Sequence, residues 1–169
     1  MTAVSFVSPA SEIRVKVADF AVATEPAVLS TVGVGSCIAI ALFDREKRVG
    51  GMAHVLLPSE TMARDRSNRA KFPATAIPLL LERMRALGAR PGHITAKIAG
   101  GASMFTSLLA NAGPQIGERN VSATRHALER AGIPILAQDV GGGHGRSIYF
   151  HLRDGSLHVR SLIKGDVVL

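Results

Sequence analysis

Cys37 is the only cysteine of the 169-residue chain, and it ends a glycine-rich segment, Thr31-Val-Gly-Val-Gly-Ser-Cys37. His54 ends a second such segment, Gly50-Gly-Met-Ala-His54. A thiol and an imidazole within reach of each other can act as nucleophile and base, because the imidazole can take the thiol proton. Both residues could instead be purely structural. Cys37 could be a buried cysteine of the core, and His54 a hydrogen-bonded histidine near the end of a strand. The pair is therefore a candidate catalytic centre whose first requirement is proximity.

A hairpin would supply that proximity. Residues 37–43 are apolar throughout, which predicts a strand covered on both faces, and residues 48–57 return as a second strand. With a two-residue loop at Arg45 and Glu46, opposed residues have numbers that sum to 91, so Cys37 lies directly opposite His54. Directly opposed residues have Cβ atoms about 4.5 to 5.5 Å apart. The register assumes that no bulge interrupts the second strand.

The rest of the chain alternates strand and helix patterns. Strands are predicted at residues 13–17, 29–31, 93–98, 133–138, 146–152 and 156–163, and helices before Gly88, over residues 103–112 and before Gly132. The first helix begins near Pro78, because a start at Pro73 would place Pro78 inside it and kink it. Asn120 or Ser122 would cap the last helix. This order favours an α/β (α+β) fold, a mixed-sheet sandwich with flanking helices in a single domain.

The composition excludes several classes of protein. Hydrophobic residues make up 47% of the chain and charged residues 20%, which indicates a packed globular protein. A single cysteine excludes an internal disulfide and favours a reducing, cytoplasmic location. No second histidine lies near His54 at ligand spacing, so neither a metal nor another cofactor is expected. Residues 28–43, the longest apolar stretch, are too short and too interrupted for membrane insertion.

The formal charge of +7 raises the question of an acidic partner. Basic side chains concentrate at Arg64, Arg66, Arg69 and Lys71, where a solvated loop is the simplest interpretation. Attraction to an acidic protein surface is the second interpretation. Nucleic-acid binding is not expected, because the chain has one tyrosine and no tryptophan for base stacking.

Five motifs, taken together and in order, resemble the CheD family of chemoreceptor glutamine deamidases. They are Gly35-Ser-Cys37, Gly50-Gly-Met-Ala-His54, Lys97-Ile-Ala-Gly-Gly-Ala102, Ile116-Gly-Glu-Arg-Asn-Val121 and Asp139-Val-Gly-Gly. The resemblance implies an α/β sandwich deamidase domain over residues 13–169. Residues 1–12 match no part of the family pattern and are predicted to form a flexible N-terminal extension.

The resemblance also implies an activity. Family members hydrolyse selected receptor glutamines to glutamate with release of ammonia, and some also hydrolyse glutamyl methyl esters. On the family pattern Cys37 is the nucleophile that forms a thioester, His54 is the histidine, and Thr31 is the hydroxyl that orients it. The implied partners are methyl-accepting chemotaxis receptors and a CheC-type phosphatase. A non-catalytic module that binds such a phosphatase or the receptors is the alternative function.

The chemistry of these residues agrees with that activity. Pairing with His54 would lower the pKa of the Cys37 thiol and so activate it. Backbone N–H groups near Gly35, Ser36 and Cys37 are the nearest candidates to stabilise the oxyanion. Asn120 lies in a family motif and could support the oxyanion or the substrate, although helix capping explains it equally well.

Overall fold

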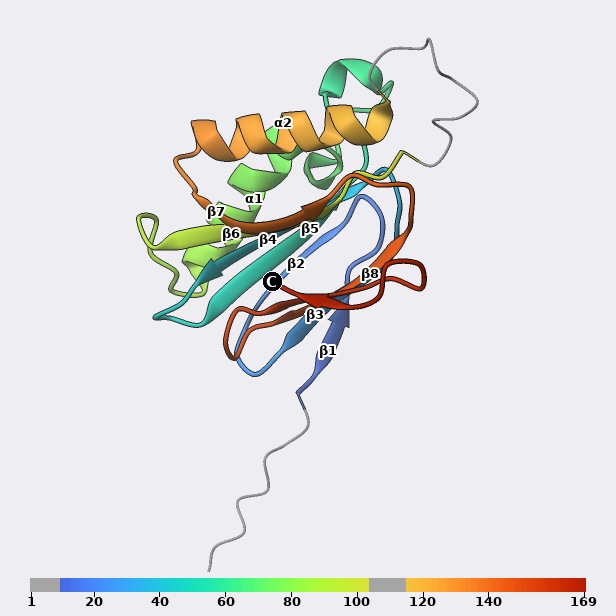
Figure 1. Ribbon diagram of the computed structural model, residues 1–169. Coiled ribbons are helices and arrows are strands. Elements are labelled where there is room, and N and C mark those ends of the chain that lie inside the picture. The colour runs from blue at the N-terminus through green and yellow to red at the C-terminus, as the bar shows by residue number, and fades with distance from the viewer. Residues whose placement is uncertain (1–9, 104–114) are drawn as a thin grey trace, which may run out of the picture.

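The computed structural model describes residues 10–103 and 115–169, which form three layers (Figure 1). Helices α1 (Pro73–Ala86) and α2 (Ile116–Arg130) cover one face of a five-stranded sheet, and a second five-stranded sheet covers the other face. Two short 3-10 helices, η1 (Glu60–Met62) and η2 (Arg69–Lys71), precede α1. Most of residues 1–12 and, apart from Ser103, the predicted helix at 103–112 lie outside the described residues.

Both sheets are mixed. The first has the order β2-β5-β4-β6-β7, in which only β6 and β7 pair in parallel; the second has the order β1-β3-β8-β9-β10, in which only β1 and β3 do. Their bounds are β1 Glu12–Arg14, β2 Phe20–Thr24, β3 Val28–Val34, β4 Ile38–Asp44, β5 Val49–Val55, β6 Ile94–Gly100, β7 Ile135–Val140, β8 Arg146–His151, β9 Leu157–Arg160 and β10 Val167–Val168. The predicted mixed-sheet sandwich with flanking helices is confirmed.

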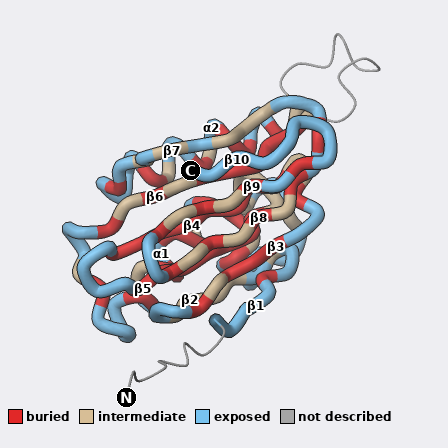
Figure 2. Tube along the Cα trace, turned by 60° about the horizontal axis from the view of Figure 1, so that its bottom comes forward, coloured by how far each residue is buried: buried red, intermediate tan, exposed pale blue. Residues whose placement is uncertain are grey.

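The first sheet is the centre of the molecule. Every residue of β4 and β5 is buried, as Figure 2 shows for the middle of the structure. Alternate residues of β4 point to opposite faces, so Ile38, Ile40 and Leu42 pack beneath the helices while Ala39 and Ala41 face the second sheet. The expectation that this strand is covered on both faces is confirmed.

The predicted register of the β4–β5 hairpin is wrong. Asp44 pairs with Val49, so four residues and not two form the loop, and Ala39 stands opposite His54. The Asp44 carboxylate explains the longer loop, because it accepts the backbone N–H groups of Glu46 and Lys47 at 3.1 Å. Since the error is two residues, Cys37 and His54 still lie on the same face of the sheet, as diagonal neighbours.

Several other boundaries differ from the prediction. The segment at Phe20–Thr24, where no strand was predicted, forms edge strand β2. The N-terminal strand is shorter than residues 13–17, since β1 ends at Arg14. Helix α1 begins at Pro73 and includes Pro78. Helix α2 begins at Ile116, so Asn120 lies inside the helix and does not cap it.

Helix α2 packs very closely on the turn that follows β6. A Cβ atom at Gly117 would lie 2.3 Å from the carbonyl oxygen of Ala102 and 2.7 Å from that of Gly101, so only glycine permits this approach. Asn120 and Thr124 follow at helical spacing and are fully buried on the same face. The approach of Gly117 therefore brings Asn120 to the end of the first sheet where β4 begins.

Candidate active site

The imidazole of His54 is held across the two sheets. Thr31 is on β3 of the second sheet and His54 is on β5 of the first, yet Thr31 Oγ1 lies 2.7 Å from His54 Nδ1 in a hydrogen bond. Both side chains are fully buried. The side chains meet because both strands direct these residues into the space between the sheets, where Leu29 and Met52 also pack.

Cys37 lies between these two strands in the chain. It follows the end of β3 and immediately precedes β4, and its side chain is buried among the residues that face the second sheet. Its exposed fraction is 8%, so the thiol is close to the surface, whereas His54 is 0% exposed. A β-bulge between Thr31 and Val34, where Gly33 has a φ of +68°, interrupts the pairing of β3 with β8, which resumes at Val34 shortly before Cys37.

The two ring nitrogens of His54 have different surroundings. Nδ1 is engaged by Thr31, whereas Nε2 is buried and makes no hydrogen bond with the described parts of the chain. An unpaired buried nitrogen costs free energy, which is a pattern typical of functional sites. Nε2 is therefore the ring nitrogen available for proton transfer.

Burial shifts both titrating groups toward their neutral forms. Desolvation raises the pKa of the Cys37 thiol, and the residue's own backbone N–H offsets this only in part. Desolvation lowers the pKa of His54 from 6.5 to about 4. Among the described residues no hydrogen bond joins Cys37 to His54 Nε2, so the expected pairing does not offset this desolvation, which favours the neutral forms of both groups.

The backbone around Cys37 is anchored through its carbonyl groups. Gly35 O accepts from Ala102 N at 2.9 Å, Ser36 O accepts from Asn120 Nδ2 at 2.9 Å, and Cys37 O accepts from Gly101 N at 2.8 Å. In a trans peptide the N–H group points away from the carbonyl oxygen. Anchoring Gly35 O and Ser36 O therefore fixes the directions of the next N–H groups, those of Ser36 and Cys37.

The N–H groups of Ser36 and Cys37 are not used in secondary structure. Neither donates a hydrogen bond to another described residue, and the N–H of Cys37 lies on the side of its own thiol. The N–H of Cys37 is thus a donor held beside the sulfur, and that of Ser36 is the preceding N–H group in the chain. The Cβ position of Gly35 has no atom within 4 Å, which leaves open space beside them.

Asn120 links this loop to the end of β5. Its Nδ2 donates to Ser36 O and also to Leu56 O at 3.1 Å, and Leu56 is two residues beyond His54. One side chain therefore ties the segments that carry the thiol and the imidazole. From the sequence, Asn120 could equally have been the cap of α2. The position of the helix start, which decides between the two roles, depends on the packing of Gly117.

The basic segment is attached to the same strand end. Leu56 N and Leu57 N both donate to Lys71 O, at 2.9 and 3.2 Å. Arg64 and Arg66 are exposed, while Arg69 is paired with Glu82 at 3.2 Å. The segment thus ends beside the residues that follow His54.

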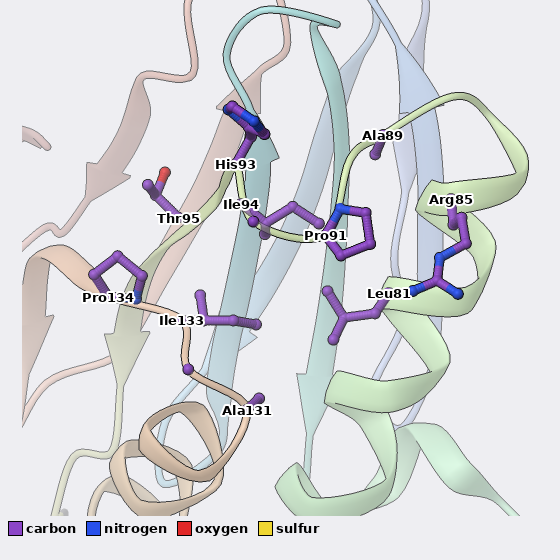
Figure 3. Close-up of a pocket in the computed structure, with 12 residues that line it drawn as sticks. Leu81, Arg85, Ala89, Pro91, His93, Ile94, Thr95, Ala131, Ile133 and Pro134 are labelled. Carbon is purple, nitrogen blue, oxygen red and sulfur yellow. The ribbon is translucent and has the colours of Figure 1, made fainter.

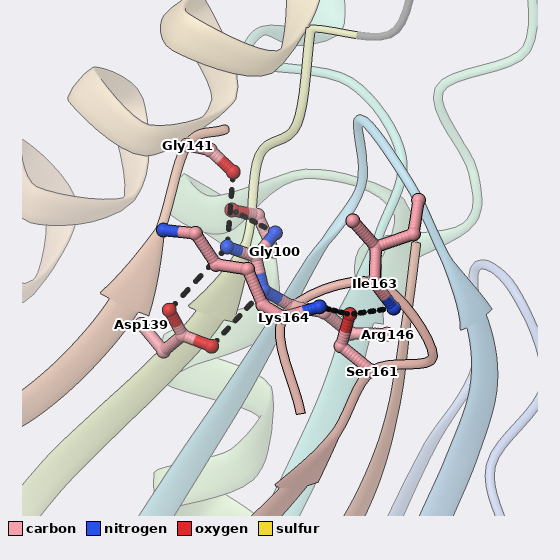
Figure 4. Close-up of polar contacts among 7 residues, drawn as sticks. All are labelled: Gly100, Asp139, Gly141, Arg146, Ser161, Ile163 and Lys164. Atoms are coloured by element: carbon pink, nitrogen blue, oxygen red, sulfur yellow. Dashed lines mark hydrogen bonds and ion pairs between the residues drawn. The ribbon is translucent and has the colours of Figure 1, made fainter. Parts of the chain in front are cut away.

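Sequence reasoning missed one buried charge near the site. Arg146, at the start of β8, has an exposed side-chain fraction of only 1% and pairs with Asp139 at 3.2 Å. It also reaches the carbonyl groups of Gly100 and Gly141 (Figure 4). The glycines around it were visible in the sequence, but an arginine in a strand pattern gave no signal of burial.

A cavity of about 430 Å³ lies at the other end of the first sheet (Figure 3). It opens between the C-terminal ends of α1 and α2 and is lined by apolar side chains such as Leu81, Ile94 and Ile133. Ile94 pairs with Asp44, at the far end of β4 from Cys37. The cavity is therefore separate from the thiol and imidazole. Among residues 10–103 and 115–169, no cluster of three or more metal-ligating side chains is found.

Sequence comparisons with known proteins identify the family of this chain. Residues 56–161 match the family model described as CheD chemotactic sensory transduction. The probable chemoreceptor glutamine deamidase CheD of Caldanaerobacter subterraneus subsp. tengcongensis is 44% identical over 90% of this chain and 94% of its own length. The chemoreceptor glutamine deamidase CheD of Halalkalibacterium halodurans is 42% identical over 91% of this chain and 96% of its own.

The chain belongs to the CheD family. Among solved structures, the Bacillus licheniformis hypothetical protein YfiH is similar with a TM-score of 0.44 and 16% identity, over 72% of this chain and 49% of that one. Within the described part of the chain, neither helix is long and apolar enough to cross a membrane.

The burial of His54 predicts an acid-dependent loss of stability. Its pKa is about 4 in the folded protein and near 6.5 when unfolded, so the unfolded state takes up the proton first. The stabilisation is complete above pH 6.5 and is lost as the pH falls toward 4. The shift corresponds to at most about 3 kcal/mol.

Urea unfolding of wild type and His54→Gln across this pH range measures the effect. The wild-type free energy of unfolding should fall more steeply than that of the variant, which has no imidazole at this position. Parallel curves for the two proteins would contradict the assignment.

Proposed function

We propose that this chain hydrolyses selected glutamine side chains of chemotaxis receptors to glutamate, with release of ammonia, through a thioester on Cys37. The observation that carries the proposal is the 2.7 Å hydrogen bond between Thr31 Oγ1 and His54 Nδ1, which leaves buried Nε2 without a partner among the described residues, on the face of the sheet that Cys37 shares. Family membership and the names of the relatives supply the substrate class. Thr31, Cys37 and His54 precede the segment matched by the family model, so their roles rest on geometry.

The first half of the reaction forms the thioester. His54 Nε2 takes the proton of Cys37 as the sulfur attacks the carboxamide carbon, and the C=O electron pair moves to oxygen. Because burial disfavours a resting thiolate and imidazolium, this proton transfer is coupled to attack. The imidazolium then protonates the departing nitrogen, the C–N bond breaks, and ammonia leaves.

The second half of the reaction restores the enzyme. Neutral His54 takes a proton from water as the water oxygen attacks the thioester carbon. Collapse of the intermediate breaks the C–S bond, Cys37 regains a proton, and glutamate remains on the receptor. Thr31 keeps the ring in the orientation that both halves need, as the third member of a triad. A glutamyl methyl ester would follow the same course with methanol as the leaving group, and we include it in the proposal.

Ser36 N–H and Cys37 N–H are the proposed oxyanion donors. Their directions are fixed by the anchored carbonyls of Gly35 and Ser36, and they are unused by the rest of the described structure. A correctly aimed donor is worth roughly 3 to 4 kcal/mol in the transition state. Gly35 contributes the open space through which the carboxamide approaches. Asn120 is a positioning residue in this scheme, because it holds Ser36 O and does not reach the thiol in any bond that the structure forms.

The basic segment is the proposed docking element for the receptor. Arg64, Arg66, Arg69 and Lys71 lie on a loop fastened to Leu56, close to the end of the strand that carries His54. Complementary charge on a receptor surface would steer association more than it would strengthen the final complex. With a free buried cysteine and receptor glutamines as substrate, we place this reaction in the cytoplasm.

The sequence also predicted an alternative function, a non-catalytic module that binds receptors or a CheC-type phosphatase. This function does not require the thiol of Cys37. Binding to either partner would survive loss of the thiol, whereas deamidation would not. A pull-down with Cys37→Ala, run beside the activity assay below, therefore separates the two functions.

Removal of the thiol should abolish the reaction. Purified receptor cytoplasmic fragments should gain about one mass unit per converted glutamine with wild type and none with Cys37→Ala. Thr31→Val should lower kcat roughly ten- to a hundredfold, because the ring loses its orienting hydroxyl, while Thr31→Ser retains most activity. Equal spectra for wild type and Cys37→Ala would refute the proposal.

Loss of the Asn120 amide should affect the chemical step. In Asn120→Leu the carbonyl of Ser36 loses its donor and the N–H of Cys37 loses its aim, so kcat should fall by roughly tenfold or more. Thr124→Val is the matched control on the same buried face of α2, where it removes a hydroxyl that has no described partner. The control should keep the wild-type kcat, and an unaltered kcat in Asn120→Leu would exclude the positioning role.

Neutralising the basic segment should weaken docking. Replacing Arg64, Arg66, Arg69 and Lys71 by Gln should raise KM for receptor fragments by about threefold or more at low salt and flatten its dependence on ionic strength. The control replaces Arg45, Lys47, Arg85 and Arg130, four exposed basic residues toward the far end of the first sheet, by Gln. If both quadruple variants change KM alike, net charge and not the segment is responsible.

A further inference from the structure

Arg146 carries a charge into the interior beside the site. Its Nε and Nη2 face the two carboxylate oxygens of Asp139 at 3.2 and 3.4 Å, Nη2 also donates to Gly141 O at 2.9 Å, and Nη1 donates to Gly100 O at 3.4 Å (Figure 4). The planar guanidinium can serve a carboxylate and two carbonyls at once because its donors are fixed in a fork. Arg146 thus joins β8 to the ends of β6 and β7.

The carbonyl of Gly100 belongs to the turn that supports Cys37. Gly141 N donates to the same oxygen at 2.9 Å, and the next two N–H groups of the turn, at Gly101 and Ala102, hold the carbonyls of Cys37 and Gly35. A Cβ atom at Gly100, where φ is +122°, would lie 2.2 Å from Cys37 O. The turn therefore stands directly behind the peptides of the proposed oxyanion site.

We propose that Arg146, neutralised and oriented by Asp139, is a positioning residue that fixes the Gly100–Ala102 turn and thereby the aim of the Ser36 and Cys37 N–H groups. The inference rests on the proposed function, since it takes Cys37 as the nucleophile. Arg146 acts only through the turn and touches neither the thiol nor His54 in any bond of the described structure.

A buried ion pair that serves folding alone is the competing explanation. Such pairs are weak evidence for stability, because well-packed apolar residues in their place are often as stable. What apolar residues cannot replace is the donation to Gly100 O and Gly141 O. A variant of Arg146 that stays as stable as wild type separates the two explanations. Its kcat should fall if Arg146 positions the turn, and should not change if the ion pair serves folding alone.

The first test is Arg146→Lys, which keeps the charge but loses the fork. With receptor fragments as substrate, kcat should fall by roughly ten- to a hundredfold while KM changes less than about twofold, because a misaimed donor is felt in the transition state. Alkylation of Cys37 by iodoacetamide should keep the wild-type rate. That displacement occurs at a saturated carbon and needs no oxyanion donor, so it reports whether the thiol itself is undisturbed.

The second test is the double variant Arg146→Met with Asp139→Leu, which removes both charges and leaves no uncompensated ion. We expect thermal stability close to that of wild type and the same loss of kcat. Lys97→Met is the matched control, since Lys97, a cation on β6, likewise holds two carbonyls, but those of Gly155 and Leu169, away from this turn. Its kcat should stay within about twofold of wild type.

Three results would overturn the inference: a kcat within about twofold of wild type in the folded variants, an equal fall in kcat and alkylation rate, or failure of both Arg146 variants to fold. The Cys37→Ala reaction, run in parallel, separates this outcome from failure of the proposed function. If Cys37→Ala keeps activity, the proposed function is refuted. If Cys37→Ala is inactive and Arg146→Lys is fully active, only the proposed role of Arg146 is refuted.

Discussion

The packing of one sheet on the other is the constraint on which the site depends. Thr31 and His54 belong to different sheets, and their 2.7 Å bond forms only because both strands direct these residues into the same buried space. A neutral imidazole tolerates this space, as its pKa of about 4 shows, whereas an imidazolium does not. The core that stabilises the fold therefore also favours the neutral form of His54 and holds the orientation of its ring.

The loop that carries Cys37 holds two backbone N–H groups, those of Ser36 and Cys37, that donate to no other described residue. Most buried backbone groups in proteins are paired, so free donors can be kept in place only when the opposite side of the peptide is held. Here three carbonyls in succession are held, two by the turn after β6 and one by Asn120. Gly100, Gly101 and Gly117 allow the turn and helix α2 to approach closely enough to do so. The glycines and Asn120 therefore hold the backbone of the proposed nucleophile, Cys37, from the side of its carbonyl groups.

Periodicity predicted much of the fold, because burial on one or two faces leaves a pattern in the order of residues. The C-terminal hairpin shows this, since strands were predicted at residues 146–152 and 156–163, and β8 and β9 form there with Ile148, Phe150 and Val159 buried. The hairpin register was not predictable, because the Asp44 carboxylate builds a four-residue loop through local hydrogen bonds. Edge strand β2 escaped prediction because it is only half buried and gains its order from pairing with β5.

The sequence by itself determined the family and named the residues that the site brings together, because a lone thiol, a histidine and five ordered glycine-containing motifs are properties of residue order. It also determined that Cys37 and His54 share a face, since an error of two residues in register leaves the face unchanged. Only the tertiary structure decided how they are held. Three features each join segments that are distant in sequence: the contact of Thr31 with His54, the anchoring by Asn120 and the burial of Arg146. The order of residues alone does not show which distant segments come into contact.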